Sequence, residues 1–158
     1  MKTLIIYASK YGCTADCAIN LKSRLNSDVT VLDIKNISKN TNCSDYDTII
    51  IGSSVYVGKI AKPLRGFCEN NKDTLMKKRI GIFLCCALPE DVIKVLNENF
   101  PSALLKHAST TKAFGSEARL DKMSFVDKMI IKAFTKGDFS KFKVSSERID
   151  DFAKEITS

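Results

Sequence analysis

Short apolar runs alternate with amphipathic segments along this chain, and the alternation limits the possible folds more than any other feature. Residues 47–52 and 79–86 are almost entirely apolar, and residues 3–8 and 29–34 are similar. A strand that is apolar on both faces is typical of a parallel sheet that is covered on both sides. The segments between these runs have helical periodicity, so the pattern indicates an α/β fold.

The order of the elements predicts one doubly wound domain. Strands are expected at residues 3–8, 29–34, 47–52, 79–86 and 110–114, and helices at residues 14–25, 63–71, 89–99, 124–136 and 146–156. This order predicts a five-stranded parallel sheet with helices on both faces. A chain of 158 residues suits a single domain, 1–158. Residues 116–143 separate the fifth strand from the last helix, where only a few residues are needed, and therefore form an insertion.

Composition excludes several classes of protein. No run approaches the roughly 18 apolar residues of a membrane span, and no secretory signal pattern is present, so we expect a soluble, cytoplasmic protein. Six cysteines occur without a C-x-x-C pair, and His107 is the one histidine. We therefore expect no metal site and no disulfide framework, with most cysteines buried as thiols in a reducing compartment.

The loop after the first strand carries the most specific functional motif, Ser9-Lys10-Tyr11-Gly12-Cys13-Thr14. A strand that turns through such a loop into a helix directs backbone N–H groups and a helix N-terminus at one place, which favours an anion. The loop has neither the Gly-Lys-Ser/Thr ending of a nucleotide P-loop nor the spaced glycines of a dinucleotide site. We expect a phosphate monoester here, and the alternative is an ordinary turn capped by Thr14.

Two further loops are expected beside this one, because ligands of such sheets bind beyond the carboxyl ends of the strands. The third strand leads into Ser53-Ser54-Val55-Tyr56-Val57-Gly58-Lys59, and the fourth into Cys86-Ala87-Leu88-Pro89-Glu90. Together the three loops are suited to hold a flat ring by its faces and a phosphate by its tail. Cys85 and Cys86 form either a packed strand end or a redox-active thiol. No nucleophile–base pair is evident, so the catalytic residues are unknown.

The motif and the order of strands and loops resemble the flavodoxin-like family, whose Ser/Thr-x-x-Gly-x-Thr loop binds the phosphate of FMN. The resemblance covers nearly the whole chain and implies FMN as the cofactor. It implies that Ser9, Lys10, Tyr11, Gly12, Cys13 and Thr14 bind the phosphate, that Ser53, Ser54, Val55, Tyr56 and Gly58 meet the ring, and that Cys86, Ala87 and Leu88 meet its other side. The third loop lacks an aromatic residue, which implies weaker flavin binding and a more open ring edge.

The charge differs from that of typical flavodoxin electron carriers, which are strongly acidic. The 25 Lys and Arg residues against 18 Asp and Glu residues give a formal net charge of +7. A basic surface favours an anionic partner, such as an acidic redox protein, anionic lipid headgroups or a substrate with carboxylates. Neither a helix-turn-helix pattern nor an aromatic-basic ribbon is present, so we expect no binding to nucleic acid.

The insertion carries a predicted basic helix at residues 124–136. Ser124-Phe125-Val126-Asp127 reads as its capping box, and Gly137 as its end. Lys128, Lys132 and Lys136 line up beside an apolar face of Phe125, Val126, Met129, Ile130, Ala133 and Phe134. Two interpretations follow: a core element with solvated lysines, or a surface helix that meets a membrane face or a lipophilic, acid-bearing substrate.

The C-terminal third is also similar to the menaquinone-dependent protoporphyrinogen dehydrogenases, through residues 115–120, 125–132 and 151–156. This similarity implies an FMN-dependent oxidoreductase that takes electrons from an anionic tetrapyrrole and passes them to quinone, with peripheral contact at the inner membrane face through residues 124–136. The chain is somewhat short for that family, and its second loop lacks the arginine that those enzymes tend to carry. Two alternatives remain: a flavodoxin electron carrier that serves a redox partner protein, and a non-enzymatic flavodoxin-fold interaction module.

Overall fold

The computed structural model describes residues 1–38, 41–86 and 91–158, and five strands of this part of the chain form one sheet. The strand order is β2-β1-β3-β4-β5, and every neighbouring pair is parallel. The strands are β1 (Lys2–Ala8), β2 (Asp28–Asp33), β3 (Thr48–Ser54), β4 (Arg79–Cys85) and β5 (Thr110–Ala113). The predicted doubly wound sheet is confirmed, and its strand order switches at β1 and β3, where such sheets bind ligands.

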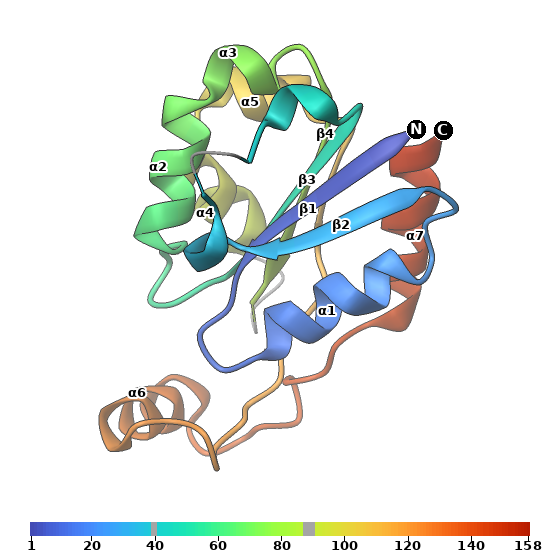
Figure 1. Cartoon of the computed structure of the whole chain (residues 1–158). Coiled ribbons are helices and arrows are strands. Elements are labelled where there is room, and N and C mark those ends of the chain that lie inside the picture. The colour runs from blue at the N-terminus through green and yellow to red at the C-terminus, as the bar shows by residue number, and fades with distance from the viewer. Residues whose placement is uncertain (39–40, 87–90) are drawn as a thin grey trace.

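Helices cover both faces of the sheet (Figure 1). One face carries α1 (Cys13–Lys22) and α7 (Ser146–Thr157). The other face carries α2 (Lys62–Asn70), α3 (Lys72–Leu75), α4 (Val92–Asn99) and α5 (Ser102–His107). Two 3-10 turns, η1 (Ile34–Asn36) and η2 (Cys43–Asp45), lie between β2 and β3. The helix of the insertion, α6 (Phe125–Thr135), lies apart from both layers in Figure 1.

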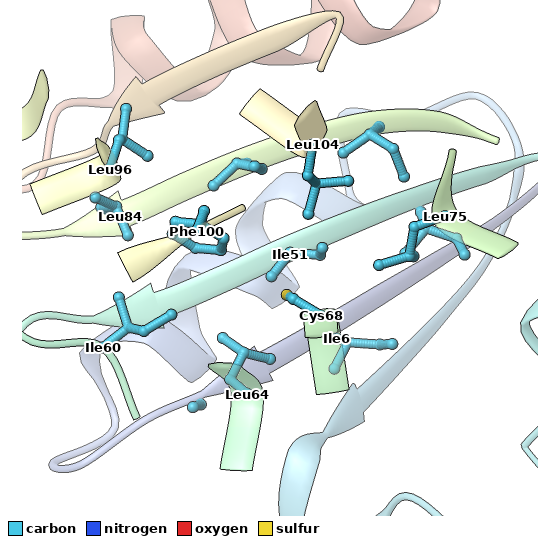
Figure 2. Packing of buried hydrophobic residues seen from close by; sticks show 14 of the residues in the cluster. Ile6, Ile51, Ile60, Leu64, Cys68, Leu75, Leu84, Leu96, Phe100 and Leu104 are labelled. Atoms are coloured by element: carbon cyan, nitrogen blue, oxygen red, sulfur yellow. The ribbon is translucent and has the colours of Figure 1, made fainter. Parts of the chain in front are cut away.

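The central strands are apolar on both faces because each face has its own core. Ile49 and Ile51 pack with the helices α2 to α5, whereas Ile50, between them, packs with α1 and α7. Figure 2 shows the first of these cores, where Leu64 and Cys68 of α2 and Leu104 of α5 surround Ile51. The alternation of side chains along a strand therefore explains why the run at residues 48–51 has no polar face.

Three phenylalanines fill the second core. The rings of Phe83 and Phe114 are stacked with centroids 4.6 Å apart, and Phe152 of α7 meets both edge-on. Gly52 of β3 makes room for this group, because a Cβ atom there would lie 2.1 Å from Cζ of Phe83. The glycine in the middle of an otherwise apolar strand is thus required by close packing.

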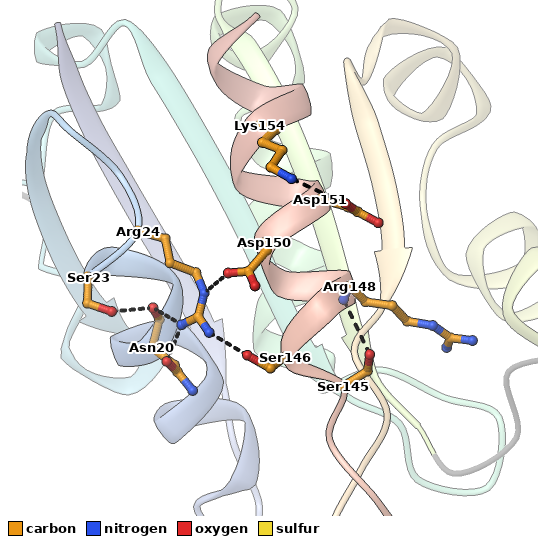
Figure 3. Close-up of polar contacts among 9 residues, drawn as sticks. All are labelled: Asn20, Ser23, Arg24, Ser145, Ser146, Arg148, Asp150, Asp151 and Lys154. Atoms are coloured by element: carbon orange, nitrogen blue, oxygen red, sulfur yellow. Dashed lines mark hydrogen bonds and ion pairs between the residues drawn. The ribbon is translucent and has the colours of Figure 1, made fainter.

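A polar contact joins the first helix to the last (Figure 3). Arg24, just after α1, pairs with Asp150 of α7 and donates to Oγ of Ser146 at 2.7 Å. The same guanidinium donates to the carbonyl oxygen of Asn20 at 2.9 Å, which ties it to α1. Both helices on this face are therefore linked at one end by a single side chain.

Several boundaries differ from the prediction. Helix α1 begins at Cys13 and ends at Lys22, and α5 was not predicted because its six residues are too few for a clear period. Helix α4 begins at Val92, and Pro89, the predicted start, lies outside the described residues. Among the described residues no helix combines the length and the apolar character that crossing a membrane requires.

The helix of the insertion has the predicted ends, and its burial distinguishes between the two interpretations of it. Oγ of Ser124 accepts from the backbone N–H of Asp127, and Lys136 and Gly137 end the helix with φ of 51° and 79°. Its apolar side chains are largely exposed, with 77% of Phe125 and 68% of Phe134 accessible. The interpretation of this helix as a core element is therefore wrong, and α6 is a surface helix.

Candidate functional site

The loop between β1 and α1 is shaped by a glycine in the left-handed region. Gly12, the residue before α1, has φ of 94°, and its backbone N–H donates to Oγ of Ser9 at 3.0 Å. The first amide N–H groups of α1 have no acceptor within the helix, as at every helix start. Ser9 therefore holds the loop in a conformation that leaves the N-terminus of α1 available to an anion.

The side chain of Thr14 points most directly to a ligand. Thr14 is fully buried, and its Oγ1 has no hydrogen-bond partner in the part of the chain that the structure describes. Such a hydroxyl costs about 1–3 kcal/mol, so proteins rarely leave one unpaired without a reason. The alternative in which Thr14 caps α1 is wrong, because Gly12 holds the capping position and Thr14 lies inside the helix. The hydroxyl is thus available to an oxygen of a bound anion.

The loop after β3 forms a tight and strained turn. Tyr56 and Lys59 exchange two backbone hydrogen bonds of 2.9 and 3.0 Å, and the residues between them, Val57 and Gly58, have φ of 49° and 72°. Positive φ at both central residues defines a type I′ turn. Gly58 adopts it freely, whereas the β-branched Val57 is strained by about 1–2 kcal/mol. Strain of this kind is common at functional sites.

Asp127 of α6 links the two loops, although it lies far from them in the sequence. Its carboxylate accepts from the hydroxyls of Tyr11 and Tyr56, the latter at 2.6 Å, and pairs with Nζ of Lys10 at 2.9 Å. The same Nζ lies 3.4 Å from the centroid of the Tyr56 ring. The hydrogen bonds from Tyr11, Tyr56 and Lys10 hold the pKa of Asp127 well below its usual range. Hydrogen bonding to this carboxylate raises the pKa of Tyr56 in turn.

Arg119 of the insertion places a second positive charge, besides that of Lys10, at the first loop. Its guanidinium pairs with Asp16 and Glu117, and Nη1 donates to the carbonyl oxygen of Tyr11 at 3.4 Å. The hydrogen bond to Asp16, and to a smaller extent the one to Glu117, raises the pKa of Arg119 above its usual value. Sequence reasoning missed Arg119 and Asp127 as site residues. Their signals were membership of the segments 115–120 and 125–132, which carry the second family resemblance, and for Asp127 also its place in a capping box.

A cavity of about 590 Å³ lies between these loops and the insertion, within the usual size range of ligand sites. Of the predicted site residues, those that line it are Ser9, Lys10, Tyr11, Cys13, Thr14, Ser54, Val55, Tyr56, Gly58 and Cys86. Gly12 and Ser53 do not line it. Ser53 is fully buried and accepts from the backbone N–H of Ala61 at 3.4 Å, so it supports the loop. Ala87 and Leu88 lie outside the described residues.

The opposite wall of the cavity comes from segments that were not predicted to form the site. Helix α4 contributes Lys94, Val95 and Glu98, and Asp91 lies just before it. The insertion contributes Ser116, Glu117, Met123, Asp127, Ile130, Ile131, Phe134, Thr135, Asp138, Lys141 and Phe142. The three aligned lysines of α6 do not line the cavity. Lys132 and Lys136 are exposed and Lys128 is half-buried. His107 lies on α5 and its Nε2 is 2.8 Å from the carbonyl oxygen of Lys78, a structural contact.

Comparisons with known proteins agree with this architecture. A family model described as a flavodoxin domain matches residues 4–144. A search of curated proteins finds no match.

Three solved structures illustrate the likeness in fold. The flavodoxin of Streptococcus pneumoniae TIGR4 is 16% identical with a TM-score of 0.62, over 99% of this chain and 98% of that one. Flavodoxin 1 of Bacillus cereus is 18% identical with a TM-score of 0.58, over 99% and 97%. The flavodoxin of Fusobacterium nucleatum, solved with flavin mononucleotide bound, is 17% identical with a TM-score of 0.53, over 99% and 96%. At these identities the likeness concerns the fold.

Proposed function

The chain belongs to the flavodoxin-domain family, and from this premise we propose that residues 1–158 form one domain that binds FMN and transfers electrons. The single observation that carries the proposal is the unpaired, fully buried hydroxyl of Thr14 at the N-terminus of α1. A phosphate monoester supplies the acceptor that this hydroxyl lacks. The structural neighbour from Fusobacterium nucleatum is a flavodoxin bound to flavin mononucleotide, which supports the choice of ligand.

The residues of the site suit the two ends of this cofactor. Thr14 and the first amide groups of α1 would hold the phosphate, and the positive charges of Lys10 and Arg119 would balance it. Tyr56 lines the cavity with 41% of its surface accessible, so its ring is available for stacking on a flat ligand. FMN supplies the chemistry when bound, since it accepts and releases electrons, while the protein orients it and excludes water.

The first experiment compares two ligands that differ only in the phosphate. Titration of flavin-free protein with FMN should quench flavin fluorescence at one equivalent. Riboflavin should bind more weakly, by roughly tenfold or more, because it cannot use the charged hydrogen bonds at Thr14. Equal affinity for FMN and riboflavin would mean that the phosphate of FMN does not bind at Thr14. The absence of quenching with either one would favour the alternative of a non-enzymatic interaction module.

The net charge of +7 supports electron transfer to an anionic partner, which we propose to be an acidic redox protein. Small acceptors test this without knowledge of the partner. Reoxidation of the reduced, FMN-loaded protein by ferricyanide should slow as salt is added, whereas reoxidation by cationic hexaammineruthenium should accelerate. The opposite pattern, or no dependence on salt, would contradict electrostatic steering at the site.

A second candidate function is oxidation of a substrate of the protein's own, as in the predicted protoporphyrinogen dehydrogenase that reduces quinone. This narrower assignment rests on the sequence resemblance, and one structural observation favours it: Ile130, Ile131 and Phe134 line the cavity opposite the FMN loops. Lys94 and Lys141 line it too, and they could pair with carboxylates. Rapid mixing of the oxidised, FMN-loaded protein with protoporphyrinogen should bleach the flavin faster than free FMN is bleached. If the protein-bound flavin and free FMN are bleached at the same rate, the protein has no protoporphyrinogen-oxidising activity, and its proposed function is that of an electron carrier.

The lysines of α6 lie outside the cavity lining, so they suit a flat anionic surface better than a substrate in the cavity. We propose that residues 124–136 provide peripheral contact with anionic lipid, to which each nearby lysine contributes about 1 kcal/mol. Changing Lys128, Lys132 and Lys136 together to Glu should abolish salt-sensitive binding to phosphatidylserine vesicles and preserve FMN affinity. Wild-type protein that ignores such vesicles at low salt would contradict this contact.

A further inference from the structure

Three buried cysteine side chains meet behind the loop that precedes α1. Cys13 and Cys17 lie one turn apart on α1, and Cys85 is the last residue of β4. Their Sγ atoms all lie within 4.8 Å of one another. Their exposed fractions are 8%, 3% and 2%. The chain has no C-x-x-C pair, so the sequence gives no sign of this cluster.

The surroundings of the cluster favour negative charge on sulfur. Hydrogen bonds from the thiols of Cys17 and Cys85, with the backbone N–H of Glu117 and the charge of Arg119, lower the pKa of Cys13. The pKa of Cys17 is raised to about 12, chiefly by its hydrogen bond to Cys13, and that of Cys85 is raised by its bonds to both partners. Cys13 is also the first residue of α1, where the helix dipole stabilises a thiolate.

We propose that Cys13, Cys17 and Cys85 form a three-sulfur site for a soft metal ion, of which Cu(I) is the expected occupant. Three sulfurs at a metal–sulfur distance of about 2.3 Å around one ion lie about 4 Å apart, so the cluster needs to contract by less than about 1 Å. Thiolates select Cu(I) among the physiological metals, whereas zinc takes four ligands in structural sites. Among the described residues no fourth His, Cys, Asp or Glu side chain joins this group.

Binding of the Cu(I) ion requires that the thiol protons leave and that the ion has a path to the sulfur atoms. Binding of one Cu(I) forms three metal–sulfur bonds and displaces up to three protons, one from each thiol, which pass to solvent without any change of oxidation state. Cys13 and Cys85 line the cavity, so the ion reaches the sulfurs from there. This is the cavity in which we propose that FMN binds, so the flavin-free protein is the form that takes up the ion.

The experiment is a competition for Cu(I) between the reduced, flavin-free protein and the chromophoric chelator bicinchoninate, without oxygen. Wild-type protein should remove one equivalent from the chelator. Cys17→Ala should weaken binding by more than roughly tenfold, since the loss of even an outer-shell partner of a metal ligand costs that much. Cys68→Ala is the matched control, because Cys68 is a fully buried thiol in the other core, and it should bind Cu(I) as wild type does.

Either of two results would overturn the proposal: wild-type protein that takes no Cu(I), or equal losses in the Cys17 and Cys68 variants. X-ray absorption of the Cu(I)-loaded wild-type protein provides a test that needs no variant. It should show three sulfur neighbours at a single distance. Nitrogen or oxygen neighbours, or only two sulfurs, would place the ion at another site.

Discussion

Replacing Thr14 by valine should stabilise the flavin-free protein and weaken FMN binding at the same time. Valine has nearly the shape of threonine and a similar helix propensity, so the change removes the hydroxyl and little else. That hydroxyl is fully buried and unpaired, and such a group costs about 1–3 kcal/mol. The free energy of unfolding should therefore rise by about 1 kcal/mol or more, which corresponds to about 2–4 °C per kcal/mol in a chain of this size.

The same substitution should have the opposite effect on the ligand. A hydrogen bond to a charged phosphate contributes about 1.5–3 kcal/mol, so the dissociation constant for FMN should rise roughly 10- to 150-fold. Urea denaturation of flavin-free protein measures the first effect, and fluorescence titration with FMN measures the second. The two effects together distinguish a ligand-binding hydroxyl from one that only supports the fold.

Thr48 offers a matched control within the same chain. Its Oγ1 is also buried without a partner, but Thr48 begins β3, at the end of the strand opposite to the cofactor loop. Thr48→Val should stabilise the protein to a similar extent and leave FMN affinity unchanged. The reasoning is refuted if Thr14→Val binds FMN as wild type does, or if it unfolds more easily than wild type without flavin.

Three further predictions concern the ring, the insertion and the core. Tyr56→Ala should weaken FMN binding and raise the midpoint potential in a redox titration, because stacking favours the neutral oxidised ring, whereas Tyr56→Phe should preserve the potential. Asp127→Asn should tighten FMN binding, because it removes a negative charge beside Lys10 and Tyr11. The control Asp121→Asn, at an exposed position, should leave FMN binding unchanged. Weaker FMN binding by Asp127→Asn would mean that the carboxylate orders the site. The pKa of Asp127 is lower in the folded protein than in the unfolded chain, so the contacts of its carboxylate stabilise α6 fully above about pH 4. This stabilisation is lost as the pH falls through the folded-state pKa, and hydrogen exchange of the α6 amides should therefore accelerate only in strong acid. Gly52→Ala should destabilise the fold by about 1–3 kcal/mol or more through overlap with Phe83, whereas Gly66→Ala, in open space on α2, should stabilise it slightly. Equal denaturation midpoints for the two variants would contradict the close packing at Gly52.

Most of the fold could be predicted from the sequence because strands and helices depend on local patterns of apolar residues. Period-two and continuous apolar runs identified all five strands, and the helical period identified α1, α2 and α7. The loop of residues 9–14 could be placed between β1 and α1 because these elements are adjacent in the chain, and its binding of an anion stays a prediction. The meeting of the first two loops with Cys86 followed from the rule that parallel strands present their carboxyl ends at one edge.

The errors concern burial and long-range contacts. The apolar residues of α6 indicated either a core or a surface helix, and the period could not distinguish them because it describes one helix and not its neighbours. Asp127 reaches Tyr56 across 71 residues, and Arg119 reaches Tyr11 across 108. No local pattern carries information over such separations, so neither residue could be assigned to the site.

The sequence by itself determined the class of the sheet, the position of the loop between β1 and α1, and the ends of α6, because backbone geometry and capping depend on residues close along the chain. Only the tertiary structure decided that Thr14 has no partner among the described residues, that Asp127 joins two loops, and that Cys85 lies beside Cys13 and Cys17. Burial and hydrogen-bond satisfaction depend on every segment that packs around a side chain, and these segments come together only when the sheet and its crossover helices are complete.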